Sequence, residues 1–131
     1  MELANALRTL GVDGVPINFL DPRPGTRLAD MPLLRPEECL ATIAVFRLML
    51  PRAEIIVMGG RETQLGNMQR RIFQAGASGT IVGDYLTTRG SGSAAVLDMI
   101  RAQGFRPRLS GDSAGQAIAR RARSHIDLIR D

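Results

Sequence analysis

Short apolar runs alternate with longer stretches of helical spacing along this chain. Three runs are predicted strands: Val15–Phe19, Ile55–Met58 and Thr80–Val82. The middle run lies between Glu54 and the pair Gly59-Gly60, which is typical of a strand buried on both faces in a parallel sheet. Because glycine allows an immediate turn, Arg61 and Glu62 are expected at the carboxyl end of that strand, where α/β folds bind their ligands.

Apolar residues at helical spacing fill the intervals. Helices are predicted over Glu2–Leu10, Pro36–Leu50, Thr63–Ala75 and Ser93–Gln103. Gly11, Pro51, Gly76 and Gly104 stand where these helices should stop. An irregular stretch, Phe105–Asp112, is expected next. It precedes an amphipathic tail helix whose apolar face holds Ala114, Ile118, Ala122, Ile126 and Ile129.

One helix followed by three strand–helix units predicts an α/β fold with parallel strands, outer helices and right-handed crossovers. Three strands are too few for a closed barrel, which takes about eight. An open sheet of this kind would expose apolar edges. The pattern therefore predicts part of a larger fold. Pro16 is expected at a strand start or a sheet edge, because it cannot donate a ladder hydrogen bond.

The longest stretch without periodicity is Leu20–Arg35, which contains three prolines and a glycine. Long loops inside compact domains are usually functional or disordered. Four large apolar residues in the loop predict that it packs against the domain and is functional: Leu28, Met31, Leu33 and Leu34.

With 131 residues, of which 44% are hydrophobic, the chain is expected to be one globular domain. No apolar run approaches the roughly 18 residues of a spanning helix. The first residues lack the pattern of a signal peptide. A cytoplasmic location is the resulting expectation.

All 17 basic residues are arginine, and the net charge is +4. The basic excess gathers near the end of the chain, at Arg106, Arg108, Arg120, Arg121 and Arg123. Nucleic-acid binding by this cluster is a minor alternative, because few aromatic residues accompany it.

A single cysteine, Cys39, excludes an internal disulfide and any metal cluster that needs several thiolates from this chain. Cys39 lies among apolar helix residues and is expected in the core. His125 has no partner at ligand spacing and is expected at the surface.

Five segments together resemble the biotin synthase family, in its C-terminal biotin and thiamin synthesis-associated domain. They are Val15-Pro-Ile-Asn-Phe-Leu-Asp-Pro-Arg-Pro-Gly-Thr, Pro36-Glu-Glu-Cys-Leu-Ala-Thr-Ile-Ala-Val-Phe-Arg, Gly59-Gly-Arg-Glu, Ala75-Gly-Ala and Val82-Gly-Asp-Tyr-Leu-Thr-Thr. The resemblance covers residues 1–107. Residues 108–131 form a tail that is not distinctive.

The resemblance implies the last three βα units of a TIM-type (β/α) barrel. The family consists of radical S-adenosylmethionine enzymes that use iron–sulfur clusters to insert sulfur into dethiobiotin. By this resemblance Asn18 contacts dethiobiotin, and Leu20 and Asp21 line the floor nearby. An amide at a strand's carboxyl end also offers both a donor and an acceptor.

Two departures from the family pattern stand out. The CxxxCxxC loop of the radical-generating cluster is absent, and Ile56 occupies the position of an arginine that ligates the auxiliary cluster. The chain alone is therefore expected to be inactive and to need a missing N-terminal barrel half. The alternatives are a stand-alone oligomeric ligand-binding or interaction module, or a segment of a thiazole synthase or hydrogenase maturase.

Other residues near the strand ends are less favoured as ligand-binding residues. Arg61 and Glu62 could hold a carboxylate, but pairing with each other is the favoured interpretation. Asp84 and Tyr85 follow the last strand, where barrels bind phosphate, yet the segment has too few glycines to favour this. No metal ligand is predicted in this chain.

Overall fold

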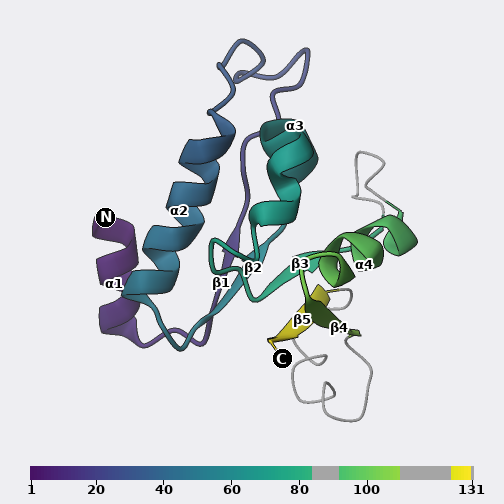
Figure 1. Cartoon of the computed structure of the whole chain (residues 1–131). Coiled ribbons are helices and arrows are strands. Elements are labelled where there is room, and N and C mark those ends of the chain that lie inside the picture. Colours follow the sequence, from purple (N-terminus) through teal and green to yellow (C-terminus); the bar gives the residue numbers. More distant parts are fainter. Residues whose placement is uncertain (84–91, 110–124, 131) are drawn as a thin grey trace.

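The computed structural model describes residues 1–83, 92–109 and 125–130 (Figure 1). Its elements are α1 (Glu2–Leu10), β1 (Gly14–Ile17), α2 (Pro36–Met49), β2 (Glu54–Val57), α3 (Arg61–Leu65), the 3-10 helix η1 (Gly66–Arg71), β3 (Gly79–Ile81), α4 (Ser93–Arg101), β4 (Phe105–Leu109) and β5 (His125–Arg130).

The strands form one sheet in the order β1-β2-β3-β5-β4. β1, β2 and β3 are parallel, with Val15 opposite Ile55 and Val57 opposite Thr80. β5 runs antiparallel to both β3 and β4. The predicted parallel strands with outer helices are confirmed. Pro16 lies in β1, at the edge of the sheet, as expected for a residue without a backbone N–H.

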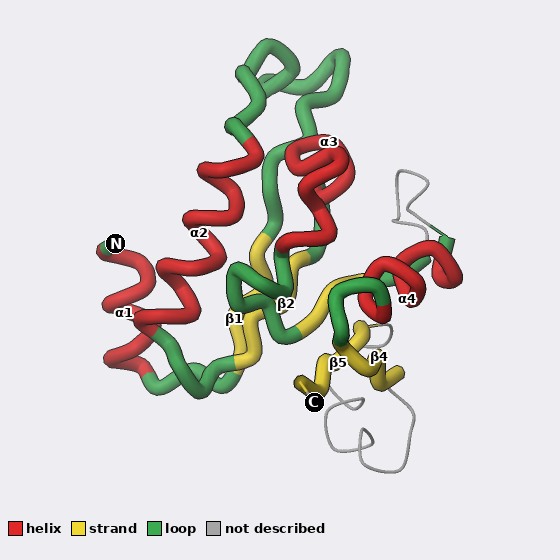
Figure 2. Tube along the Cα trace, viewed as in Figure 1, coloured by secondary structure: helices red, strands yellow, loops and turns green. Residues whose placement is uncertain are grey.

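One face of the parallel strands is covered by helices. Figures 1 and 2 show α2 and α3 beside β1 and β2. Side chains on this face are nearly inaccessible, at 0% exposure for Ile55, Val57 and Thr80. Ile55 and Val57 pack with Ile43 of α2 and Leu65 of α3 in a single core. Burying each such aliphatic side chain stabilises the fold by about 1.5–3 kcal/mol.

The opposite face of the same strands is only partly covered. Side chains alternate between the two faces of a strand, so this face carries Pro16, Ile56 and Ile81. Pro16 is exposed, and Ile56 and Ile81 are partly exposed. This surface, with the Asn18 and Met58 side chains at its carboxyl end, is called the open face below.

The predicted helix Thr63–Ala75 is wrong in both its bounds and its regularity. α3 begins at Arg61 and ends at Leu65, and the 3-10 helix η1 follows. Gly66 has φ 47° and ψ −125°, which no α-helix accepts. Its missing side chain allows this break.

The tail also differs from the prediction. Phe105–Leu109 is a strand rather than an irregular stretch, and residues 125–130 are a strand rather than the end of a helix. The apolar positions of this short segment fit periods of both 2 and 3.6 residues. Pairing with β3 supplies the hydrogen bonds that β3 would otherwise lack on that side. The earlier part of the predicted tail helix lies outside the described residues.

The loop between β1 and α2 extends beyond the ends of α2 and α3 (Figure 1). The prediction that its large apolar side chains pack against the domain is wrong. They are about half exposed: Leu28 48%, Met31 49%, Leu33 51% and Leu34 47%.

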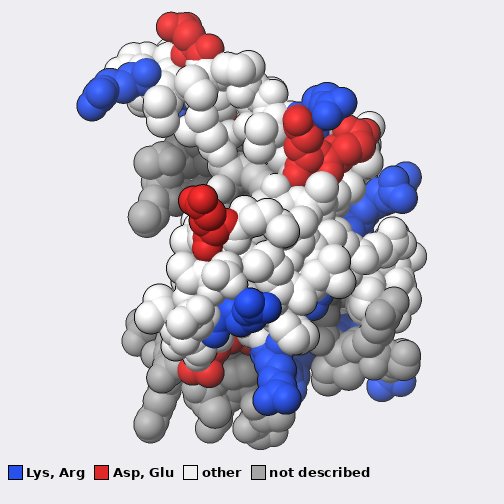
Figure 3. Space-filling model, turned by 90° about the vertical axis from the view of Figure 1, so that its left-hand side faces the viewer, with Lys and Arg blue, Asp and Glu red and all other residues white. Residues whose placement is uncertain are grey.

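Acidic and basic side chains are interspersed on the face shown in Figure 3. Arg106 and Arg108 of the predicted basic cluster lie on β4, whereas Arg120, Arg121 and Arg123 fall outside the described residues. No helix in the described part of the chain has the length and apolar character needed to cross a membrane.

Candidate functional site

Asn18 directly follows β1, at the carboxyl end of the parallel strands. It is exposed, and its Oδ1 accepts a hydrogen bond of 2.9 Å from the Gly59 N–H. Within the described residues its Nδ2 group has no hydrogen-bond partner. The Asn18 amide therefore presents two free N–H donors, while its acceptor is occupied by the turn after β2.

Two apolar side chains share the level of Asn18 on the open face. The register places Ile17 opposite Val57 and Val57 opposite Thr80. Met58 and Ile81 are the next residues along β2 and β3, so they lie beside Asn18 on the same face. The result is an amide donor next to an apolar surface. Such a combination suits a ligand with one polar acceptor and a hydrocarbon part.

The turn after β2 holds the end of β1 closely. The Phe19 N–H donates to the Gly59 carbonyl at 2.9 Å. Gly60 has φ 72°, and a Cβ at this position would lie 2.0 Å from the Phe19 carbonyl oxygen. Only glycine fits there, because both the backbone conformation and the space exclude a side chain. The Gly59-Gly60 pair therefore allows the two strand ends to approach.

Gln64 of α3 joins this arrangement, and sequence reasoning missed it. Its side chain is buried, at 4% exposure. Nε2 donates to the Leu20 carbonyl at 2.5 Å, and Oε1 accepts from the Leu34 N–H at 2.8 Å. No local pattern marks this glutamine, because its partners lie 44 and 30 residues away in the chain.

Arg61 lies in the core rather than on the open face. It is 1% exposed, and its guanidinium donates to Thr80 Oγ1 at 2.8 Å and to Glu62 Oε1 at 2.6 Å. Thr80 in turn donates to the Val57 carbonyl at 2.8 Å. The favoured pairing of Arg61 with Glu62 is present. Arg61 and Asn18 both follow strands, but they lie on opposite faces of the sheet.

The other predicted site residues make fewer contacts with the strand ends. Leu20 is 37% exposed, and its carbonyl binds Gln64. The Asp21 carboxylate forms an ion pair with Arg23. Asp84 and Tyr85 lie outside the described residues.

The described residues do not fit an iron–sulfur cluster. Ile56 has no donor atom. Cys39 is 0% exposed, and burial raises the pKa of its thiol above the usual value. The described part of the chain has no group of three or more His, Cys, Asp or Glu side chains that could hold a metal ion.

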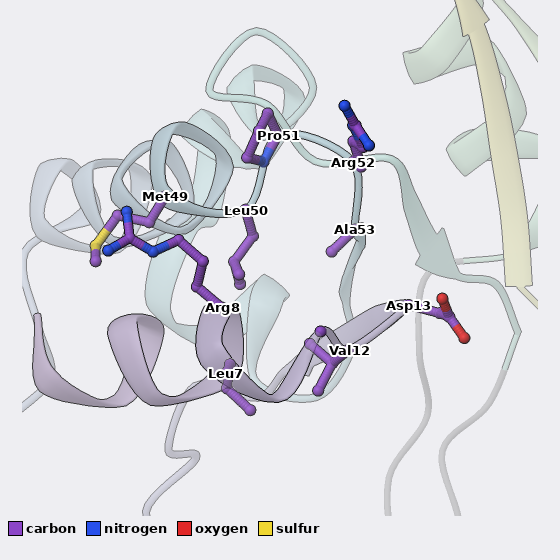
Figure 4. A pocket seen from close by; sticks show the side chains of 10 residues that line it. Leu7, Arg8, Val12, Asp13, Met49, Leu50, Pro51, Arg52 and Ala53 are labelled. Atoms are coloured by element: carbon purple, nitrogen blue, oxygen red, sulfur yellow. The ribbon is translucent and has the colours of Figure 1, made fainter.

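A separate pocket lies at the amino ends of β1 and β2, away from Asn18 (Figure 4). It has a volume of about 560 Å³ between α1 and the end of α2, and its lining includes Leu7, Val12 and Leu50. The Arg8 side chain beside it donates to Asn5. We assign it no chemistry, because its charged lining residues, Arg8, Asp13 and Arg52, do not converge on one point in Figure 4.

Comparison with known proteins gives this geometry a family context. A family profile described as the Biotin and Thiamin Synthesis associated domain matches residues 16–106. A protein named biotin synthase from Anaeromyxobacter sp. (strain Fw109-5) is 55% identical over 108 residues, which cover 82% of this chain and 29% of that protein. A biotin synthase from Geobacter metallireducens is 55% identical over 101 residues, covering 77% of this chain and 31% of that protein.

The chain thus spans less than a third of the length of these relatives. The family profile, by contrast, covers most of the chain, including all three parallel strands from residue 16 onward and the turn that holds Asn18. The chain therefore belongs to the Biotin and Thiamin Synthesis associated domain family.

Proposed function

We propose that this chain is the C-terminal segment of a biotin synthase-like radical S-adenosylmethionine enzyme and forms the substrate side of its barrel. One observation carries the proposal. Asn18 offers free amide donors on the open face beside Met58 and Ile81, in a chain 55% identical to proteins named biotin synthase. The open face is the surface that a barrel interior would contain.

Dethiobiotin matches the chemistry of this surface. Its ureido carbonyl oxygen accepts hydrogen bonds, and its alkyl chain is apolar. The Asn18 Nδ2 group donates to the acceptor, while Met58 and Ile81 pack against hydrocarbon. Leu20 and Asp21 border the same strand end. Asn18 binds and orients the substrate and transfers no proton.

S-adenosylmethionine and the iron–sulfur clusters supply the radical and the sulfur in this family. The donor atoms in the described part of the chain do not fit a cluster, so we assign these groups to the remainder of the enzyme. The segment alone is then inactive, and its partner is an N-terminal barrel half. A cytoplasmic location accords with this function.

The test is dethiobiotin binding by the chain combined with a cysteine-bearing N-terminal half. Asn18→Asp keeps the acceptor for the Gly59 N–H but removes the donor, so affinity should fall about tenfold, as expected for one lost hydrogen bond of about 1–1.5 kcal/mol. Calorimetric titration measures the affinity, and thermal denaturation checks that the midpoint stays nearly constant. Unchanged affinity would overturn the role of Asn18.

A stand-alone oligomeric module is the second candidate, favoured by the partly uncovered open face and by the edge position of β1. A symmetric oligomer would cover these surfaces. Light scattering on the isolated chain distinguishes the two, because a stable monomer contradicts the oligomeric module. A thiazole synthase or hydrogenase maturase segment would instead show no dethiobiotin binding when complemented.

A further inference from the structure

We propose that Gln64 is a positioning residue. It fixes the loop of residues 20–34 and, through Leu20, the orientation of Asn18. Ligand affinity then depends on a side chain that does not touch the ligand. This inference rests on the proposed function of Asn18 as a substrate contact.

Gln64 uses both ends of its amide to hold both ends of the loop. Nε2 donates to the Leu20 carbonyl, where the loop begins, and Oε1 accepts from the Leu34 N–H, where it ends. An amide is suited to this task because it carries a donor and an acceptor on one rigid group. Its burial makes the loss of either bond costly, since the freed backbone group is left without a partner.

The segment that Gln64 holds is continuous with the site. Asn18, Phe19 and Leu20 are three consecutive residues, and each is fixed by the stretch from Gly59 to Gln64. Release of Leu20 leaves the segment held by its two bonds to Gly59 and by the buried Phe19 side chain. The exposed Asn18 amide, held by one bond, then has more freedom to rotate away from the level of Met58 and Ile81.

In the described part of the chain, the hydrogen bonds that tie the loop to the rest of the fold come from Gln64. Its other hydrogen bonds are local: Thr26 Oγ1 donates to the Arg23 carbonyl, and Arg23 pairs with Asp21. Among the described residues, the two bonds of Gln64 are the only hydrogen bonds that link residues 20–34 to the body of the domain. The large apolar side chains of the loop are about half exposed, so they constrain it less than fully buried side chains would.

Hydrogen exchange on the full chain tests the clamp directly. In Gln64→Met both bonds are lost at nearly constant volume, and exchange of the Leu34 amide and of residues 20–34 should accelerate about tenfold. The strand β2 should exchange as before. The matched control is Gln74→Met, which removes one exposed glutamine bond, to Gln103, and should leave the loop unchanged.

Gln64→Glu adds a readout that general destabilisation would not produce. When protonated, the introduced carboxyl can donate to Leu20 and accept from Leu34, as the amide does. When ionised, it can only accept. Loop protection relative to wild type should therefore be low at neutral pH and recover as the pH falls toward about 4–5. A protection that does not change with pH contradicts the clamp.

Binding by the complemented chain completes the test. Gln64→Met should weaken dethiobiotin binding about tenfold, with Gln74→Met equal to wild type. If loop exchange accelerates but affinity is unchanged, while Asn18→Asp still weakens binding, Gln64 does not position the site and this inference fails. If Asn18→Asp has no effect either, the proposed function fails instead.

Discussion

Arg47 shows how one side chain can join several segments of this fold. From α2 it donates to the carbonyls of Gly76, Leu50, Pro51 and Ala53 and to the Ser78 hydroxyl, at 2.6–3.2 Å. Ser78 Oγ also accepts from the Ile55 N–H. The guanidinium fork makes this possible, because Nη1 shares its two N–H groups among three carbonyls while Nε and Nη2 reach Gly76 and Ser78. Arg47 therefore links the end of α2, the turn before β2 and the turn before β3.

Arg47→Met should lower the free energy of unfolding by about 2–4 kcal/mol, because several charge-assisted hydrogen bonds are lost and carbonyls remain unpaired. Equilibrium urea denaturation measures the change. Arg8→Met is the matched control, since exposed Arg8 forms one side-chain bond to Asn5, and it should stay within about 0.5 kcal/mol. Equal effects of the two substitutions would refute the linking role.

At the scale of the element, α2 begins with a charged capping box. The Glu38 carboxylate accepts from the Arg35 guanidinium at 3.3 Å and from the Arg35 N–H at 2.9 Å. These two bonds hold the pKa of Glu38 below its usual value. Pro36 at the first helical position and the nearby acidic side chains also favour a helix start here.

This capping interaction predicts that the stability of the fold depends on pH. Because the folded-state pKa of Glu38 is lowered, its stabilisation is present above the unfolded pKa and is lost as pH falls through the folded one. Glu38→Gln should flatten the decline of urea midpoints between about pH 6 and pH 3. Glu37→Gln removes the same charge without a capping bond and should leave the decline in place. A Glu38→Gln profile identical to wild type would show that the cap contributes nothing.

Elements with an unambiguous period were predictable from the sequence, and the others were not. The run Ile55–Met58 has few alternatives to a buried strand, and Pro36 fixes the start of α2. Residues 125–130 fit two periods, so only pairing with β3 decides their structure. Gln64 could not be found, because its role depends on contacts between distant segments. Arg61 follows β2 as expected, but its long side chain reaches Thr80 in the core.

At the scale of the whole molecule, helices cover one face of the parallel strands, and the other face is only partly covered. Val57 is 0% exposed beneath the helices, whereas its neighbour Ile56 is partly exposed on the other side. Substitutions at these two adjacent residues therefore test two different surfaces of the sheet.

Ile56→Glu in the isolated chain should change the free energy of unfolding by less than about 1 kcal/mol, whereas Val57→Glu should cost more than about 3 kcal/mol by burying an unpaired charge. Urea denaturation separates the two. Addition of the proposed N-terminal half should yield a complex with wild type but not with Ile56→Glu, as judged by light scattering. A complex that forms equally well with Ile56→Glu would show that the open face is not buried in that complex.

Because β5 already pairs with β3 in antiparallel orientation, further strands cannot be added to the sheet at β3. The backbone donors and acceptors of β3 on that side are already paired, so an incoming strand can pair with an edge strand, β1 or β4, but not with β3. A ring of strands could be closed through β3 only after β5 had separated from it.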